Sequence, residues 1–397
     1  MKHTVCSKLW TDLNVRIPVK HVINCCKRDA YPRFTPEEIR SKGKDILTKN
    51  DVLMRDKKSW IKNNQLPSGC SQCARNFPNG YYGAHNEWIN REWTKRELKH
   101  LPDKDLTRMY EFMLGNTCNM ACMYCNKDYS NTWAQITGEK SPAVDTEWQD
   151  SILEATFEHL RHNDNDYLTF NFVGGEPLLE PNIFNVLEEI TSIMSKKSTK
   201  GHTVLITTNL TIKPKVLDNF LAIVKRYPQF RWCVCPSVDA IGTYGENIRS
   251  LMDWNLFEKN AQTLLHDKNI SSVNFLPSIN ALSIPKHKEL CSWILRNTAK
   301  AKRNKDQWDI GDNAVYSPMA MSVKILPETY VEYLDQAINL IKPYKPRHVH
   351  FLETLKNQIG QNRSEQDLID ARHWYEMHGK IKNVNYFELF PMLEDIL

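Results

Sequence analysis

Three cysteines in one short stretch constrain this chain more than any other feature. Cys118, Cys122 and Cys125 follow one another with the spacing Cys-x3-Cys-x2-Cys. Three thiolates on so short a loop can bind three irons of one cubane 4Fe–4S cluster, which leaves the fourth iron without a protein ligand. An open iron suits a cluster that binds a substrate or cofactor directly. Taken alone, the cysteines leave open a zinc site or a simple electron-transfer cluster.

The cysteine loop and a later glycine motif both follow apolar segments that read as strands. The run 109–114 precedes the cysteines, and the run 167–173 ends in Gly174, Gly175, Glu176 and Pro177. Further strands are expected at 204–208, 230–238, 273–279 and 314–323, with helices at 183–194, 216–224 and 286–295 between them. Strands that alternate with helices predict parallel pairing, with the chemistry at the carboxyl ends of the strands. The predicted fold class is α/β, a partial (β/α)6 barrel.

The two motifs, in this order and at this separation, resemble those of the radical S-adenosylmethionine (SAM) enzymes. In that family the cysteine loop follows the first barrel strand, and Tyr124 fills its aromatic position. The resemblance implies that the Gly174–Pro177 motif contacts the methionine amino group of SAM. On its own, such a glycine–proline run is also typical of an ordinary turn at a strand end.

The ends of the next two predicted strands carry further candidate SAM ligands. Thr208 and Asn209 stand where the family often has Thr-Asn-Gly, although Leu210 replaces the glycine. By the same resemblance, Ser237 and Arg249 bind the ribose and the carboxylate of SAM, and a guanidinium suits a carboxylate because it can donate two hydrogen bonds to it. The alternatives are a capped strand end for the first pair and a solvent-exposed charge for Arg249.

The first hundred residues have weak apolar periodicity and hold five cysteines: Cys6, Cys25, Cys26, Cys70 and Cys73. A small region with so little apolar patterning needs a metal or a cross-link to stabilise its fold, and four of these thiols can bind one metal centre. The choice between Cys25 and Cys26 stays open. The order of the cysteines is similar to the twitch domain, an auxiliary-cluster module that usually follows the radical SAM barrel and here would precede it. The resemblance implies an auxiliary iron–sulfur cluster; the alternative is a structural zinc ion.

Composition is that of an intracellular enzyme. The 397 residues carry a formal net charge of +5 and 25% charged residues, which does not call for a nucleic-acid partner. No apolar run is long enough for a membrane span, and eleven cysteines without a secretory signal favour metal binding in a reducing cytoplasm. The domains expected are a twitch-like module at 1–104, a radical SAM barrel at 105–327 and a helical extension at 328–397.

The resemblance implies a radical SAM enzyme. Such an enzyme cleaves SAM reductively to a 5′-deoxyadenosyl radical, which abstracts a hydrogen atom from a substrate. A peptide or protein substrate is expected first, and oxidation or rearrangement of a small molecule such as a sugar or nucleoside second. A non-enzymatic iron–sulfur electron carrier is the alternative from another class. The enzyme would need an external one-electron reductant such as flavodoxin or ferredoxin.

Overall fold

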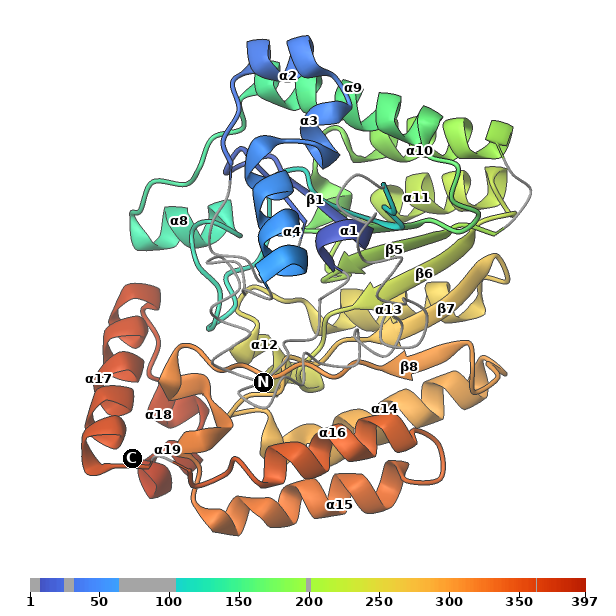
Figure 1. Cartoon of the computed structure of the whole chain (residues 1–397). Helices are drawn as coiled ribbons and strands as arrows, with labels where there is room; N and C mark the ends of the chain where they lie inside the picture. The colour runs from blue at the N-terminus through green and yellow to red at the C-terminus, as the bar shows by residue number, and fades with distance from the viewer. Residues whose placement is uncertain (1–7, 25–31, 64–104, 198–200, 362) are drawn as a thin grey trace. The chain divides into compact units, whose positions relative to one another are not determined.

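A computed structural model describes the following residues of the chain (Figure 1): 8–24, 32–63, 105–197, 201–361 and 363–397. These residues belong to two compact units. The first comprises the described residues within Met1–Gly115, Pro142–Gly174 and Pro181–Val204, and the second comprises those within Asn116–Ser141, Gly175–Glu180 and Leu205–Leu397. The predicted N-terminal metal ligands Cys6, Cys25, Cys26, Cys70 and Cys73 lie outside the described residues. The auxiliary-cluster module and the predicted domain boundaries therefore stay predictions.

The first unit contains four strands in the order β2-β1-β3-β4. Strands β3 (Met109–Met113) and β4 (Thr169–Val173) are the two predicted before the cysteine loop and the glycine motif, and they pair in parallel. β1 (Asp12–Arg16) also pairs in parallel with β3, and β2 (His21–Ile23) pairs antiparallel with β1. Sequence analysis did not predict these two strands, which extend the sheet beyond the first barrel strand.

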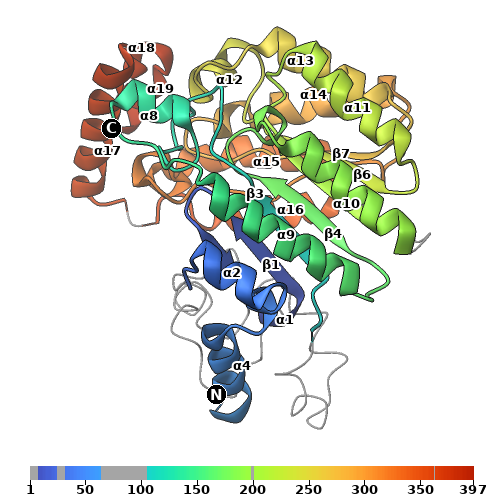
Figure 2. The ribbon, with the colours of Figure 1, turned by 90° about the horizontal axis from the view of Figure 1, so that it is seen from above.

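Helices α2 and α9 of the first unit pack against each other (Figure 2). The long α9 (Thr146–His162) buries Trp148, whose indole nitrogen donates to the Phe34 carbonyl oxygen at 2.9 Å. Next to it lies α2 (Pro36–Lys42), which begins with a capping box at Thr35. The other helices of this unit are α1 (Lys8–Thr11), α3 (Asp45–Thr48), α4 (Asp51–Asn63) and α10 (Ile183–Lys197).

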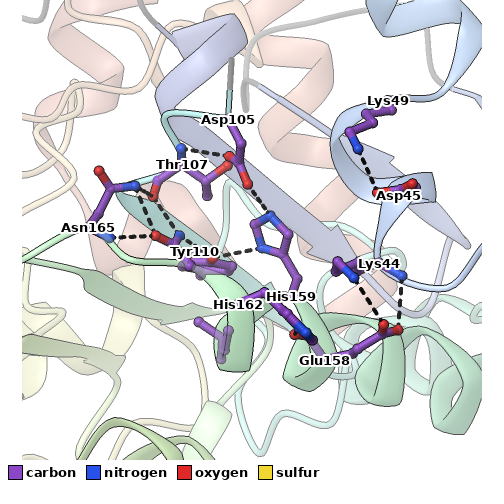
Figure 3. Close-up of polar contacts among 12 residues, drawn as sticks. Lys44, Asp45, Lys49, Asp105, Thr107, Tyr110, Glu158, His159, His162 and Asn165 are labelled. Atoms are coloured by element: carbon purple, nitrogen blue, oxygen red, sulfur yellow. Dashed lines mark hydrogen bonds and ion pairs between the residues drawn. The ribbon is translucent and has the colours of Figure 1, made fainter. Parts of the chain in front are cut away.

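A buried polar network fixes the start of β3 to α9 (Figure 3). The Asp105 carboxylate lies 2.6 Å from His159 Nε2, and His159 Nδ1 lies 2.7 Å from the Tyr110 hydroxyl. Asn163 donates to the same hydroxyl and to the Thr107 carbonyl oxygen. Because these groups gather at the amino end of β3, away from the carboxyl ends where barrel chemistry lies, they serve stability.

The second unit contains the strands β5 to β8 in that order. β5 (Thr203–Thr208) crosses the boundary, and β6 (Arg231–Pro236), β7 (Ile270–Phe275) and β8 (Trp308–Ile310) lie within the unit. The pairs β6/β7 and β7/β8 are parallel. Helices separate the strands along the chain: α11 (Pro214–Arg226), α12 (Gly242–Ile248), α13 (Trp254–His266) and α14 (His287–Lys300).

The last predicted strand is wrong in position. The expected run 314–323 folds instead into two 3-10 turns, Met319–Met321 and Val323–Ile325, and the strand β8 comes earlier, at Trp308–Ile310. Pro318 explains the difference, because it has no N–H to give to a strand partner and its ring fixes φ at the start of the turn.

The C-terminal part is helical, as predicted. It consists of α15 (Val331–Ile341), α16 (Pro346–Lys356), α17 (Glu365–Lys382), α18 (Tyr386–Leu389) and α19 (Met392–Ile396). Helix α15 packs against α14 and α16 (Figure 1). Among the described helices, none combines the length and apolarity that crossing a bilayer requires.

The predicted α/β fold class is confirmed. From β3 to β8, six strands alternate with helices along the chain, and parallel pairing is present at β3/β4, β6/β7 and β7/β8.

Candidate functional site

Hydrogen bonds from neighbouring polar side chains of the second unit hold the cysteine loop in place. The Cys118 amide donates to Asn131 Oδ1 at 2.9 Å, and Asn131 is the first residue of α8 (Asn131–Thr137). The Thr117 amide and hydroxyl donate to the two oxygens of the Glu180 carboxylate, at 2.7 and 3.1 Å. Ser130 donates to the Met120 carbonyl oxygen at 2.7 Å. These contacts fix the backbone of the cysteine loop.

The predicted glycine motif reaches the same loop. The Glu176 amide donates to the Thr117 carbonyl oxygen at 2.7 Å. A side chain at position 175 would collide with that carbonyl group, so the close approach requires Gly175. Gly174 has φ +130°, which also favours glycine, and Pro177 begins a short 3-10 helix, Pro177–Leu179. The motif therefore brings the chain after β4 against the cysteine loop.

Glu176 is fully buried, and backbone donors occupy both of its carboxylate oxygens. Its Oε2 accepts from the Asn209 amide at 2.6 Å and its Oε1 accepts from the Leu178 amide at 3.1 Å. Burial raises the pKa of Glu176 to about 7, although these N–H groups favour the charged form. The side chain thereby ties the glycine motif to the loop after β5.

The loop after β5 places Asn209 against the cysteines. Asn209 Nδ2 donates to Asn119 Oδ1 at 2.8 Å and lies 4.0 Å from the Cys118 sulfur. The Thr208 hydroxyl accepts from the Leu210 amide at 3.1 Å. Leu210 has φ +53°, so this leucine adopts the left-handed conformation that glycine adopts readily at the same place in the resembling motif. Two hydrogen bonds from Asn260, to the Leu210 and Ile212 carbonyl oxygens, support that turn.

Tyr124, Asp239 and Arg249 form a buried group beside the cysteines. The Tyr124 hydroxyl donates to Asp239 Oδ2 at 2.6 Å, and an Arg249 terminal nitrogen donates to the Tyr124 hydroxyl at 2.6 Å. The same nitrogen lies 3.6 Å from Asp239 Oδ1. Burial would lower the pKa of Arg249, but electrostatic interactions with Cys122, Tyr124 and Asp239 together raise it well above its usual range. Arg249 is thus a fixed positive charge and not a solvent-exposed one, with a side-chain exposure of 8%.

Ser237 lies at the carboxyl end of β6, next to the other candidates. Its amide donates to the Thr208 carbonyl oxygen at 2.8 Å, and it forms a parallel bridge with Leu276. All but one of the site residues predicted around the cysteine loop belong to the second unit: Cys118, Cys122, Cys125, Tyr124, Gly175, Glu176, Pro177, Thr208, Asn209, Ser237 and Arg249. Gly174 is the last residue of its segment in the first unit.

The three cysteines form no disulfide, and burial raises the pKa of each thiol. Burial raises the pKa of Cys118 to about 11 and that of Cys125 to about 12. Burial also raises the pKa of Cys122, while Arg249 and Lys382 oppose that shift. Cluster binding must displace the thiol protons, as it does for any thiolate ligand.

The residues present fit a cluster with an anionic ligand on its open iron. Within the described ranges, no three His, Cys, Asp or Glu side chains are placed around a single metal ion; a cubane differs from such a site because each of three irons takes one thiolate. Arg249 Nε is buried and has no hydrogen-bond partner among the described residues. A buried guanidinium nitrogen left without an acceptor suits a carboxylate that arrives with a ligand.

Sequence analysis missed three residues that hold the cysteine loop: Asn131, Glu180 and Lys382. Asn131 and Glu180 make the contacts given above. The Lys382 ammonium, from α17, donates to the Ala121 carbonyl oxygen at 2.5 Å. Only Glu180, three residues after the glycine motif, stands near a recognisable signal. The contacts of the other two depend on tertiary structure.

Residues 107–225 match the family model described as a 4Fe–4S single cluster domain. The matched segment contains the cysteine loop, the glycine motif and Asn209. No curated protein matches the chain.

Several solved structures are similar to parts of the chain. One is native anSMEcpe with bound AdoMet, 18% identical, with a TM-score of 0.39 over 59% of this chain and 61% of that chain. Another is native anSMEcpe with bound AdoMet and Cp18Cys peptide, 18% identical, with a TM-score of 0.37 over 59% of each chain. The similarity thus spans about three fifths of the length of these structures. The family-model match supports the predicted 4Fe–4S cofactor, and the assignment of Cys118, Cys122 and Cys125 as its ligands stays a prediction.

Proposed function

We propose that this protein is a radical SAM enzyme whose cluster is held by Cys118, Cys122 and Cys125. The observation that carries the proposal is Arg249, a buried cation whose Nε has no hydrogen-bond partner in the described part of the chain, beside a loop with three cysteines that form no disulfide. An electron-transfer cluster with four protein ligands has no use for a buried carboxylate receptor next to it. A cluster that binds SAM needs one, because the methionine end of SAM carries a carboxylate.

The chain's own residues would do four things at this site. Arg249 binds the SAM carboxylate, and Tyr124 with Asp239 fixes the guanidinium in position. Thr208, Asn209 and Ser237 line the strand ends, where hydroxyl and amide groups suit the ribose and the methionine amine. Glu176 holds the glycine motif against the loop after β5. Burial excludes water, which protects a reactive species from side reactions.

When bound, the cluster and SAM supply a one-electron cleavage that produces a 5′-deoxyadenosyl radical able to take a hydrogen atom from an unactivated carbon. The protein needs no general acid or base for that step, so the site can work without a catalytic carboxylate pair. An external reductant, such as a flavodoxin or a ferredoxin, would supply the electron.

The proposed substrate is a peptide or protein. This choice follows the sequence resemblance, since relatives with auxiliary cysteine modules most often modify peptides. The peptides in the anSMEcpe structures are bound to those proteins, and the choice of substrate for this chain does not rest on them. We further propose that Cys70, Cys73, Cys6 and one of Cys25 and Cys26 bind the auxiliary metal centre, as an iron–sulfur cluster.

The test is formation of 5′-deoxyadenosine from SAM by the anaerobically reconstituted full chain with dithionite as reductant. The wild type is expected to form 5′-deoxyadenosine. Cys122→Ala is expected to lose this activity because it loses the cluster. Arg249→Met is expected to lose the activity while it retains the cluster. Cys291→Ala, which removes a buried cysteine away from the loop, is the matched control. Absence of 5′-deoxyadenosine from wild type that holds a full cluster would exclude the proposal and favour an electron carrier.

A further inference from the structure

The cysteine loop pairs with the chain that follows α12. The Ala121 amide donates to the Ser250 carbonyl oxygen at 3.0 Å, and the Met123 amide donates to the Ile248 carbonyl oxygen at 3.0 Å. These two bonds flank Cys122. They also join the loop to the segment that carries Arg249, so the cluster ligands and the buried cation share one piece of backbone structure.

One side chain from the C-terminal helix enters this junction. Lys382 is the last residue of α17, and its ammonium donates to the Ala121 carbonyl oxygen at 2.5 Å and to the Ser250 hydroxyl at 3.1 Å. The ammonium also lies 4.5 Å from the centre of the Trp133 ring, on α8. Both views show α17 beside α8 (Figures 1 and 2). Lys382 thus contacts the cysteine loop, the segment after α12 and helix α8.

The charge of Lys382 lies next to the cysteine loop. Burial lowers the pKa of Lys382 to about 8, and Ala121, whose carbonyl oxygen accepts from the ammonium, directly precedes Cys122. The positive charge is therefore held against the backbone of a predicted cluster ligand. The other titratable groups of the buried site include Arg249 and Asp239, which pair with each other, and Glu176, which is fully buried.

A nearby positive charge changes the energy of reducing a cluster. Reduction adds one electron to a group that three thiolates already make negative, and in a low-dielectric site a fixed ammonium stabilises the more negative state more. Reductive cleavage of SAM requires this reduced state. A lysine at this place would therefore favour the reduced state of the cluster as well as pack against the loop.

We propose that Lys382 is a positioning residue that clamps the cysteine loop and makes the Cys118/Cys122/Cys125 cluster easier to reduce. The inference rests on the cluster of the proposed function, but not on SAM cleavage. It gives the C-terminal helix α17, which carries no recognisable motif, a direct part in the redox chemistry of the site.

The experiment is a redox titration of the reconstituted full chain without SAM, in which electron paramagnetic resonance reports the reduced cluster. Lys382→Gln keeps a hydrogen-bond donor and removes the charge, and Lys382→Arg keeps both. At a fixed potential near the wild-type midpoint, we expect the ratio of reduced to oxidised cluster to be about tenfold lower in Lys382→Gln, which corresponds to a midpoint about 59 mV lower. Lys382→Arg is expected to stay close to the wild type.

Lys380→Gln is the matched control, because Lys380 is exposed on the same helix. A wild-type midpoint in Lys382→Gln would overturn the inference, and so would an equal fall in Lys380→Gln. Iron retained by each variant is counted first, so that a lost cluster is not read as a shifted potential; complete loss of iron in both Lys382 variants would also overturn the electrostatic role. A cluster that responds to Lys382 yet leaves SAM intact would contradict the proposed function alone.

Discussion

Among single residues, Glu176 could stabilise the folded backbone or bind SAM, and a substitution at this position tells the two roles apart. The resemblance to radical SAM enzymes assigns this position to the SAM amine, whereas both carboxylate oxygens accept backbone N–H groups in the folded chain. Glu176→Gln puts an NH2 group against one of those donors. We expect it to lower the free energy of unfolding by about 1–3 kcal/mol, the cost of leaving a buried polar group unsatisfied.

Chemical denaturation of the protein without its cluster measures this effect, with the exposed Glu376→Gln as control. An unchanged unfolding free energy together with weaker SAM binding would instead assign Glu176 to the ligand.

Asp105 gives a pH-dependent prediction at the same scale. Burial would raise its pKa, but the hydrogen bond and charge of His159 and the Thr107 amide lower it from 3.8 to about 2. A folded-state pKa below the ordinary value stabilises the fold above about pH 4, and this stabilisation is lost as the pH falls toward 2. Because the Asp105 side chain is 36% exposed, the effect is about 1 kcal/mol.

Asp105→Asn should therefore lower the unfolding free energy at pH 7 and leave it unchanged near pH 2. Denaturation curves at the two pH values check this. An equal loss at both would show that shape or packing, and not the charge of Asp105, matters.

Among elements, the cysteine loop depends on neighbours that no motif contains. Glu180 accepts two hydrogen bonds from Thr117, immediately before Cys118. Residues that orient metal ligands in this way typically contribute 10- to 100-fold to metal affinity. Glu180→Ala is expected to lose iron to a chelator about 10- to 100-fold faster than the wild type, with Glu376→Ala as control. Equal rates in the two variants would mean that the loop holds its shape without Glu180.

The sequence predicts elements well where periodicity is strong and fails where tertiary contacts decide. Alternating strands and helices predict β3 to β7 within a few residues, and the cysteine and glycine motifs mark the ends of β3 and β4. Strands β1 and β2 escape prediction because they lie in the N-terminal hundred residues, where apolar periodicity is weak, and β2 has only three residues. Strand β8 has only three residues, so the longer run around Pro318 is mistaken for it. In the site, Leu210 shows why a motif mismatch can mislead: Asn260 supports a turn that the leucine alone disfavours.

For the whole molecule, the number of iron atoms per chain tests the two-centre hypothesis. If Cys118, Cys122 and Cys125 bind one cubane and the N-terminal cysteines another, the reconstituted wild type holds about eight irons, and Cys70→Ala/Cys73→Ala holds about four. Iron and labile sulfide analysis measures both. About four irons in each protein, with zinc in the wild type alone, would make the N-terminal centre a structural zinc site.

The central claim is that SAM would bind at the open iron of the cluster held by Cys118, Cys122 and Cys125, with Arg249 as the partner of its carboxylate. The most direct measurement is electron–nuclear double resonance of the reduced cluster with SAM labelled by 15N at the amine and 17O at the carboxylate. The account predicts hyperfine coupling from both labels, weakened or lost in Arg249→Met. A reduced cluster that shows no coupling to either label at saturating SAM would contradict it.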